Sequence, residues 1–124
     1  MNKVILVIED QEDNRRIMRD LLTSVDFQVL EAETGEDGVR SAELHKPDLI
    51  LMDIQLPDFD GYEATRRIKA KPDLKSIPII VVTSYALSGD DEKAFEAGCD
   101  AYVSKPFSPR ALLAKIREIL ASNI

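Results

Sequence analysis

Short apolar runs alternate with longer amphipathic stretches along the whole chain. The runs are "VILVI" from Val4, "FQVLEA" from Phe27, "DLILMD" from Asp48, "PIIVVTS" from Pro78 and "AYVS" from Ala101. Their length and their β-branched residues predict strands. The stretches between and after them carry apolar residues three or four positions apart, which predicts helices. This alternation predicts an α/β fold with five strands in a parallel sheet and five helices.

The first predicted helix lies between the first two strands. Its apolar face is expected to hold Ile17, Met18, Leu21, Leu22 and Val25, and its solvent face Arg15, Arg16 and Arg19. Similar stripes predict the other four helices at residues 35–46, 62–70, 87–97 and 109–121. Each helix is therefore expected to cover one face of the sheet with an apolar stripe.

The polarity of the strands predicts their order in the sheet. The first, third and fourth runs are almost wholly apolar, as expected for central strands covered by helices on both faces. The second carries Gln28, Glu31 and Glu33 at or near its ends, and the fifth is short and mixed, so these two are expected at the edges. With right-handed crossovers, the predicted fold is a doubly wound sheet of order 2-1-3-4-5, which is flavodoxin-like.

Composition narrows the class of protein. The chain has 124 residues, a size typical of one domain, and we expect residues 1–124 to form one folded unit. Its net charge of -7 makes nucleic acid and anionic membrane unfavourable partners. No stretch is long and apolar enough for a membrane span, and the start does not resemble a signal peptide. The expected location is therefore the cytoplasm.

Three acidic residues follow the first and third predicted strands. Glu9 and Asp10 end the first strand, and Asp53 ends the third. In such a sheet these ends meet at the crevice where ligands bind, and clustered carboxylates repel one another unless a cation lies among them. Oxygen ligands without cysteine or histidine favour Mg²⁺. Glu9 and Asp10 could instead favour the start of a helix, but Asp53 lacks that explanation because Pro57 follows it so soon.

Two further polar groups are expected at the same edge of the sheet. Thr83 ends the fourth strand, and Lys105 follows the fifth in "SKPF". Taken alone, Thr83 is an ordinary β-former and Lys105 an ordinary loop lysine. A cis peptide bond between Lys105 and Pro106 would fix the direction of the lysine. Together with the three acids, they place a hydroxyl and an ammonium group in one crevice.

The motifs that carry these groups resemble the receiver domain of two-component response regulators. The resemblance extends from Lys3 to Ala121 and rests on "VIED", "LILMDIQLPDFDG", "VVTSYA", "GCDAYVSKPF" and the spacings between them. Within that family the chain is most similar to stand-alone, DivK-like regulators of the cell-division type. Receiver modules of hybrid kinases look much the same.

The resemblance implies a role for each residue of the crevice. Asp53 would accept a phosphoryl group from a phosphohistidine on a sensor histidine kinase or a histidine phosphotransfer protein. Mg²⁺ would be held by Asp10, Asp53 and the backbone carbonyl of Gln55, with Glu9 acting through water. Lys105 and Thr83 would stabilise the charge of the transferred group.

The resemblance also implies an output through protein contacts. Thr83 would move toward the phosphoryl group, Tyr102 would turn inward, and the face of the fourth helix, fifth strand and fifth helix would change. Tyr102 could equally be a packed aromatic of an edge strand. Tyr85, two residues after Thr83, is expected to shield the acyl phosphate from water. The family pattern leaves open a homodimer on phosphorylation.

The end of the chain soon after the fifth helix predicts no effector domain, so output is expected to reach a downstream protein target. The chain could regulate that target, relay phosphate, act as a phosphate sink, or be a receiver module cut from a hybrid kinase. It is not expected to be an enzyme beyond its own phosphotransfer and dephosphorylation.

Three rival functions share parts of this pattern. A Mg²⁺-dependent phosphatase with an aspartate nucleophile needs a second acid two residues later, where this chain has Gln55. A flavodoxin-like electron carrier needs a phosphate-binding first loop, but the loop "EDQEDN" would repel phosphate. An interaction module with a degenerate acidic site stays an alternative if Asp53 is not phosphorylated.

Overall fold

A five-stranded parallel sheet forms the centre of the computed structural model, which describes residues 2–83, 90–105 and 107–122. Its strands are β1 (Val4–Ile8), β2 (Gln28–Ala32), β3 (Leu49–Met52), β4 (Ile79–Thr83) and β5 (Ala101–Ser104). The order is β2-β1-β3-β4-β5, and every neighbouring pair is parallel. The predicted fold class and strand order are thus confirmed.

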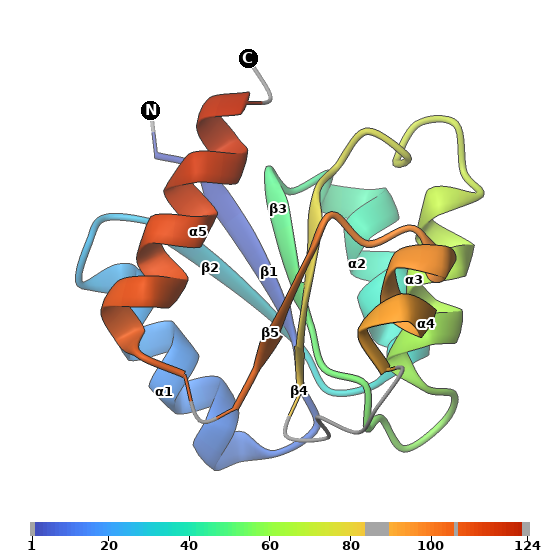
Figure 1. Cartoon of the computed structure of the whole chain (residues 1–124), viewed down its shortest axis with the longest axis horizontal. Coiled ribbons are helices and arrows are strands. Elements are labelled where there is room, and N and C mark those ends of the chain that lie inside the picture. Colours follow the sequence, from blue (N-terminus) through green and yellow to red (C-terminus); the bar gives the residue numbers. More distant parts are fainter. Residues whose placement is uncertain (1, 84–89, 106, 123–124) are drawn as a thin grey trace.

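Helices cover both faces of the sheet (Figure 1). They are α1 (Glu12–Thr23), α2 (Gly35–His45), α3 (Gly61–Lys69), α4 (Asp90–Ala97) and α5 (Pro109–Ser122). Helices α1 and α5 lie on one face, and α2, α3 and α4 lie on the other (Figure 1). Across the described ranges, no helix has the length and apolar character needed to cross a membrane.

The central strands contribute side chains to two separate apolar cores. In β1, Leu6 and Ile8 pack into the core beneath α2, α3 and α4, whereas Ile5 and Val7 pack into the core beneath α1 and α5. Strands β3 and β4 divide their residues between the two cores in the same alternating way. Side chains of a strand point to opposite faces in turn, so a strand covered on both faces must be apolar throughout. This is why these three strands read as continuous apolar runs.

The first helix differs from its prediction in which residues it buries. Arg15 was expected in solvent but is only 5% exposed, whereas Ile17 was expected in the core and is 57% exposed. Arg15, Met18 and Leu22 are spaced by three and four residues, so they share one face of α1. The buried side of α1 is thus the face that carries Arg15, Met18 and Leu22. The Arg15 guanidinium forms hydrogen bonds with polar groups beneath the helix.

Helix α4 is described from Asp90 to Ala97, within the predicted range 87–97. Residues 84–89 lie outside the described part of the chain, so the predicted first turn of this helix is not described. The bounds of α2, α3 and α5 agree with the predictions to within one residue at each end.

The loop from β3 to α3 is fastened at two points. The Asp58 carboxylate accepts hydrogen bonds from the backbone amides of Gly35 (2.9 Å) and Glu36 (2.8 Å) at the start of α2. At the other end of the loop, the Gly61 amide donates to the carbonyl of Ile54 at 2.8 Å. A Cβ atom on Gly61 would lie 2.2 Å from the backbone oxygen of Asp53. The loop after Asp53 can therefore close against α3 only with glycine at this position.

We predict that Gly61→Ala lowers the free energy of unfolding by roughly 2–4 kcal/mol, because the added methyl group meets backbone that cannot move aside. Urea unfolding followed by circular dichroism measures the change. Gly35→Ala is the matched control, since the three atoms nearest to its Cβ belong to the side chain of Phe59 and not to the backbone. A loss for Gly61→Ala no larger than that for Gly35→Ala would show that the close approach does not constrain the loop.

Candidate functional site

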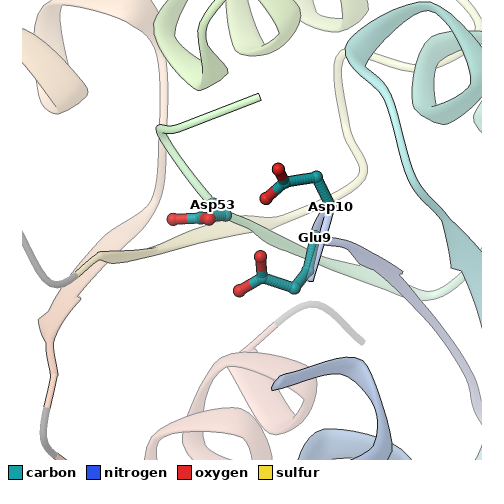
Figure 2. A group of neighbouring side chains, drawn as sticks. All are labelled: Glu9, Asp10 and Asp53. Carbon is teal, nitrogen blue, oxygen red and sulfur yellow. The ribbon is translucent and has the colours of Figure 1, made fainter. Parts of the chain in front are cut away.

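Three carboxylates meet at the carboxyl ends of β1 and β3. Glu9 and Asp10 follow β1 directly, and Asp53 follows β3, where its amide donates to the carbonyl of Ile8 at 3.0 Å. One oxygen from each carboxylate lies within 4.8 Å of the others. Figure 2 shows the three side chains gathered at this junction. The structure thus brings together the three acids that the sequence analysis singled out.

Lys105 neutralises one member of this cluster. Its ammonium group donates to Glu9 Oε1 at 2.9 Å, and both side chains are largely buried. Burial alone would raise the pKa of Glu9, but the Lys105 ammonium and a hydrogen bond from the Gln11 amide hold that pKa below its usual range. Glu9 therefore keeps its charge inside the protein.

The charge of Asp53 is only partly compensated by the Lys105 ammonium and the Ile54 amide. Its carboxylate is buried and accepts a hydrogen bond from the Ile54 amide at 2.9 Å. Burial and the neighbouring Glu9 carboxylate raise the pKa of Asp53 to about 7. The pKa of Asp10 is also raised, by desolvation and by Glu9. A cation placed among these groups would relieve both effects, because it favours the ionised form of each carboxylate.

The acids open into a cleft of about 250 Å³. It is lined by Glu9, Asp10, Gln11, Asn14, Asp53, Gln55, Leu56 and Pro57. Oxygen ligands of one Mg²⁺ lie about 3 Å apart when they are adjacent and about 4.2 Å apart when they are opposite. The carboxylate oxygens here all lie within 4.8 Å of one another, so small side-chain movements would bring them to such distances. Among the described residues, this cluster fits a hard divalent cation by its donor atoms, its spacing and its unrelieved charge.

The remaining predicted residues differ in how far they are buried. Thr83 ends β4 and is fully buried, so its hydroxyl does not face solvent in this conformation. Tyr102 lies on β5 opposite Val81 and is partly buried against the core beneath α2, α3 and α4. Gln55 is exposed at the cleft. The predicted role of Tyr85 and the predicted cis bond at Pro106 concern residues outside the described ranges.

Two features of the site were not predicted. Gln11 and Asn14 line the cleft from the start of α1. Polar residues at the start of a helix are usually exposed to solvent, so nothing in the sequence marks these two as part of a site. The buried Arg15 contacts the loop that bears Glu9 and Asp10. Its spacing from Met18 and Leu22 could have predicted that Arg15 is buried. The prediction instead followed the charge of the residue, which favours solvent.

We predict that Asp53→Asn stabilises the metal-free protein, and more so at higher pH. The folded-state pKa of about 7 lies above the ordinary value of 3.8. Between these values the folded state binds more protons than the unfolded state, so wild-type stability falls as the pH rises. Asparagine has no such loss, and its advantage is expected to be roughly 1–3 kcal/mol at about pH 8 and smaller at about pH 5.

Urea unfolding in a chelator at both pH values measures this difference. Addition of Mg²⁺ at the higher pH is the control. A cation that binds the folded wild type stabilises it, which reduces the difference in the free energy of unfolding between Asp53→Asn and the wild type. A difference in the free energy of unfolding that does not change with pH would contradict the raised pKa of Asp53.

Sequence comparisons place the chain among response regulators. The profile of the response regulator receiver domain matches residues 5–117. The chain is 39% identical over 120 residues to the polar-differentiation response regulator DivK of Brucella ovis, covering 97% of this chain and 98% of that protein. DivK of Brucella anthropi matches equally well.

Solved structures agree in fold over nearly the whole chain. A putative response regulator from Chloroflexus aurantiacus has a TM-score of 0.93 at 28% identity, covering 98% of this chain and 99% of its own. The receiver domain of a sensor histidine kinase from Pseudomonas aeruginosa PAO1, solved with a magnesium ion coordinated in its active-site cleft, has a TM-score of 0.91 at 37% identity and the same coverage. This chain therefore belongs to the response regulator receiver domain family of two-component signalling proteins.

Proposed function

We propose that the chain is a single-domain response regulator, residues 1–124, that is phosphorylated on Asp53 in a Mg²⁺-dependent reaction. The donor is a phosphohistidine on a sensor histidine kinase or a histidine phosphotransfer protein. The observation that carries the proposal is the buried Asp53 carboxylate at the tip of a central strand, within 4.8 Å of two further acids. The membership in the receiver family supports the same reaction.

The proposed transfer moves one phosphoryl group between two side chains. An oxygen of Asp53 attacks phosphorus, the bond from phosphorus to the histidine nitrogen breaks, and the imidazole leaves and takes up a proton. The product is an acyl phosphate. Asp53 must be ionised to attack, and its attachment to the Ile54 amide fixes the direction of its carboxylate.

The proposed metal ligands are Asp10, Asp53 and the backbone carbonyl of Gln55, with Glu9 acting through water. When bound, Mg²⁺ would neutralise charge on the transferred oxygens. The ammonium of Lys105, which lies beside Glu9, and the hydroxyl of Thr83 supply the remaining electrostatic stabilisation. The magnesium ion in the Pseudomonas receiver supports this choice of cation.

The proposed output is a change in the face formed by α4, β5 and α5. A phosphoryl group adds about two negative charges at neutral pH, enough to draw the Thr83 hydroxyl toward Asp53. Tyr102 then turns inward into the space behind Thr83. The changed face binds a downstream protein target in the cytoplasm, or a second copy of the chain. The protein's catalysis is limited to its own phosphorylation and dephosphorylation.

A relay or phosphate-sink role is the second candidate. It is favoured by the similarity to the Pseudomonas receiver domain, which belongs to a sensor histidine kinase. Incubation of the phosphorylated chain with a histidine phosphotransfer protein separates the roles. Transfer onward within seconds favours a relay, whereas loss of phosphate to water alone favours a regulator.

We predict that the wild type gains one phosphoryl group when incubated with acetyl phosphate and Mg²⁺, because the cation and Lys105 hold Asp53 ionised and offset the charge of the donor. Intact mass spectrometry measures the gain. Asp53→Asn is expected to gain none, and Asp73→Asn, which changes an exposed aspartate, is the matched control and gains it as the wild type does.

Omission of Mg²⁺ is expected to slow the reaction by about two orders of magnitude. Phosphorylation of Asp53→Asn at the wild-type rate would place the acceptor elsewhere. Failure of the wild type to react, with Mg²⁺ bound, would favour an interaction module with a degenerate site.

We predict that Tyr102→Ala leaves phosphorylation of Asp53 intact but uncouples it from the α4-β5-α5 face. The ring is partly buried against the core, so its inward turn would repack that face. Amide chemical shifts measured before and after phosphorylation report the change. In the wild type they are expected to move along β5 and α5, and in Tyr102→Ala by less than about half as much. Equal shifts in both proteins would remove Tyr102 from the switch.

A further inference from the structure

Arg15 is a buried cation with five polar contacts to residues that the structure describes. Its Nη1 donates to the backbone carbonyls of Glu9 (2.9 Å) and Asp10 (3.1 Å). Its Nη2 donates to the carboxylates of Glu12 and Glu33. Its Nε lies 3.4 Å from Glu31 Oε1, which completes the set.

Two of these contacts reach the backbone of the acidic cluster. Glu9 and Asp10 follow the last residue of β1, and only Gln11 separates them from α1. A carbonyl held by a hydrogen bond fixes the rotation of its peptide plane, and through it the direction in which the neighbouring side chains leave the backbone. One guanidinium nitrogen thus holds two consecutive peptide planes of the segment that carries two of the three acids.

The other three contacts hold the guanidinium itself. Glu12 lies on α1, whereas Glu31 and Glu33 lie on and just after β2. A buried cation is costly unless it is paired, and here it is paired with one carboxylate of α1 and with two that lie on β2 or just after it. Glu12 and Glu33 are themselves more than half exposed, so they keep contact with water. The arrangement ties the acidic loop to the edge strand through one planar group that a lysine cannot reproduce.

We infer that Arg15 is a positioning residue for the divalent cation, which sets the affinity of the site by holding the backbone of Glu9 and Asp10. The inference rests on the proposed metal function of the cluster. Arg15 itself has no place among the ligands, because a cation cannot bind Mg²⁺.

Two explanations of Arg15 make opposite predictions for the metal. If the residue acted only through its charge, its removal would leave the site more negative and tighten Mg²⁺ binding. If it positions the loop, its removal frees the two carbonyls and weakens binding. The sign of the change in affinity therefore decides between charge and position.

Isothermal titration calorimetry of Mg²⁺ at about pH 8 and low salt tests the inference on the full chain. Arg15→Gln is expected to weaken the affinity by about tenfold, the size of effect typical of groups that orient metal ligands. Arg19→Gln is the matched control. Arg19 lies one turn further along α1 and donates two hydrogen bonds to the same Glu31, and none of its hydrogen bonds reaches a loop carbonyl of the described chain. Its removal is expected to change the affinity by less than about twofold.

A second readout is the Mg²⁺ concentration that gives half-maximal phosphorylation by acetyl phosphate. It is expected to rise in Arg15→Gln by the same factor as the dissociation constant, while urea unfolding at saturating Mg²⁺ shows that the variant is folded. Unchanged or tighter Mg²⁺ binding by folded Arg15→Gln would overturn the inference.

If Arg15→Gln does not fold, Arg15→Lys replaces it. Lysine keeps the charge but offers one point donor on a different stem, so the affinity is expected to fall by about twofold to fivefold, and an affinity equal to that of the wild type would overturn the inference. Wild-type protein that binds no Mg²⁺ would instead refute the metal site itself, which is a different failure.

Discussion

Mutual repulsion among three carboxylates at the tips of β1 and β3 is the constraint on which the site depends. Their oxygens lie within 4.8 Å of one another, and Glu9 and Asp53 are buried. The fold offsets this cost with groups from several elements: the Lys105 ammonium on Glu9, and the Ile54 amide on Asp53. The compensation is incomplete, since the pKa of Asp53 stays near 7. Because the negative charge of one buried acid is only partly balanced, the site favours the binding of a cation.

The parallel sheet explains why this charge can be concentrated here. Strands buried on both faces hold apolar residues along their length, and polar groups can gather only at their ends. Adjacent ends of β1 and β3 bring Asp53 against Glu9, and the close approach at Gly61 folds the next loop back over the Asp53 carbonyl. Packing of the strands into the two apolar cores keeps the ends of β1 and β3 side by side, and with them the backbone of the acids.

Much of this arrangement could be predicted from the sequence because it depends on local pattern. Continuous apolar runs identified the central strands, and an unexplained Asp53 after one of them identified the site. The surroundings of the acids depend on contacts between distant segments. The pairing of Asp58 with the start of α2 joins residues more than twenty positions apart, and no local signal marks it. Arg15 was placed wrongly because residue type was weighed above helical spacing.

The contacts of the cluster also connect the site to both edges of the sheet. Arg15 links the Glu9 and Asp10 backbone to Glu31 on β2, and Lys105, just after β5, links the Glu9 side chain to the opposite edge. A phosphoryl group on Asp53, as proposed, would compete with Glu9 for the one ammonium of Lys105, because it carries more negative charge than a carboxylate. The backbone amide of Lys105 donates a hydrogen bond to the Thr83 carbonyl at 2.7 Å. A movement of the Lys105 backbone would therefore displace the end of β4. The exchange of this ion pair would therefore act beside Thr83, one of the two residues of the proposed switch.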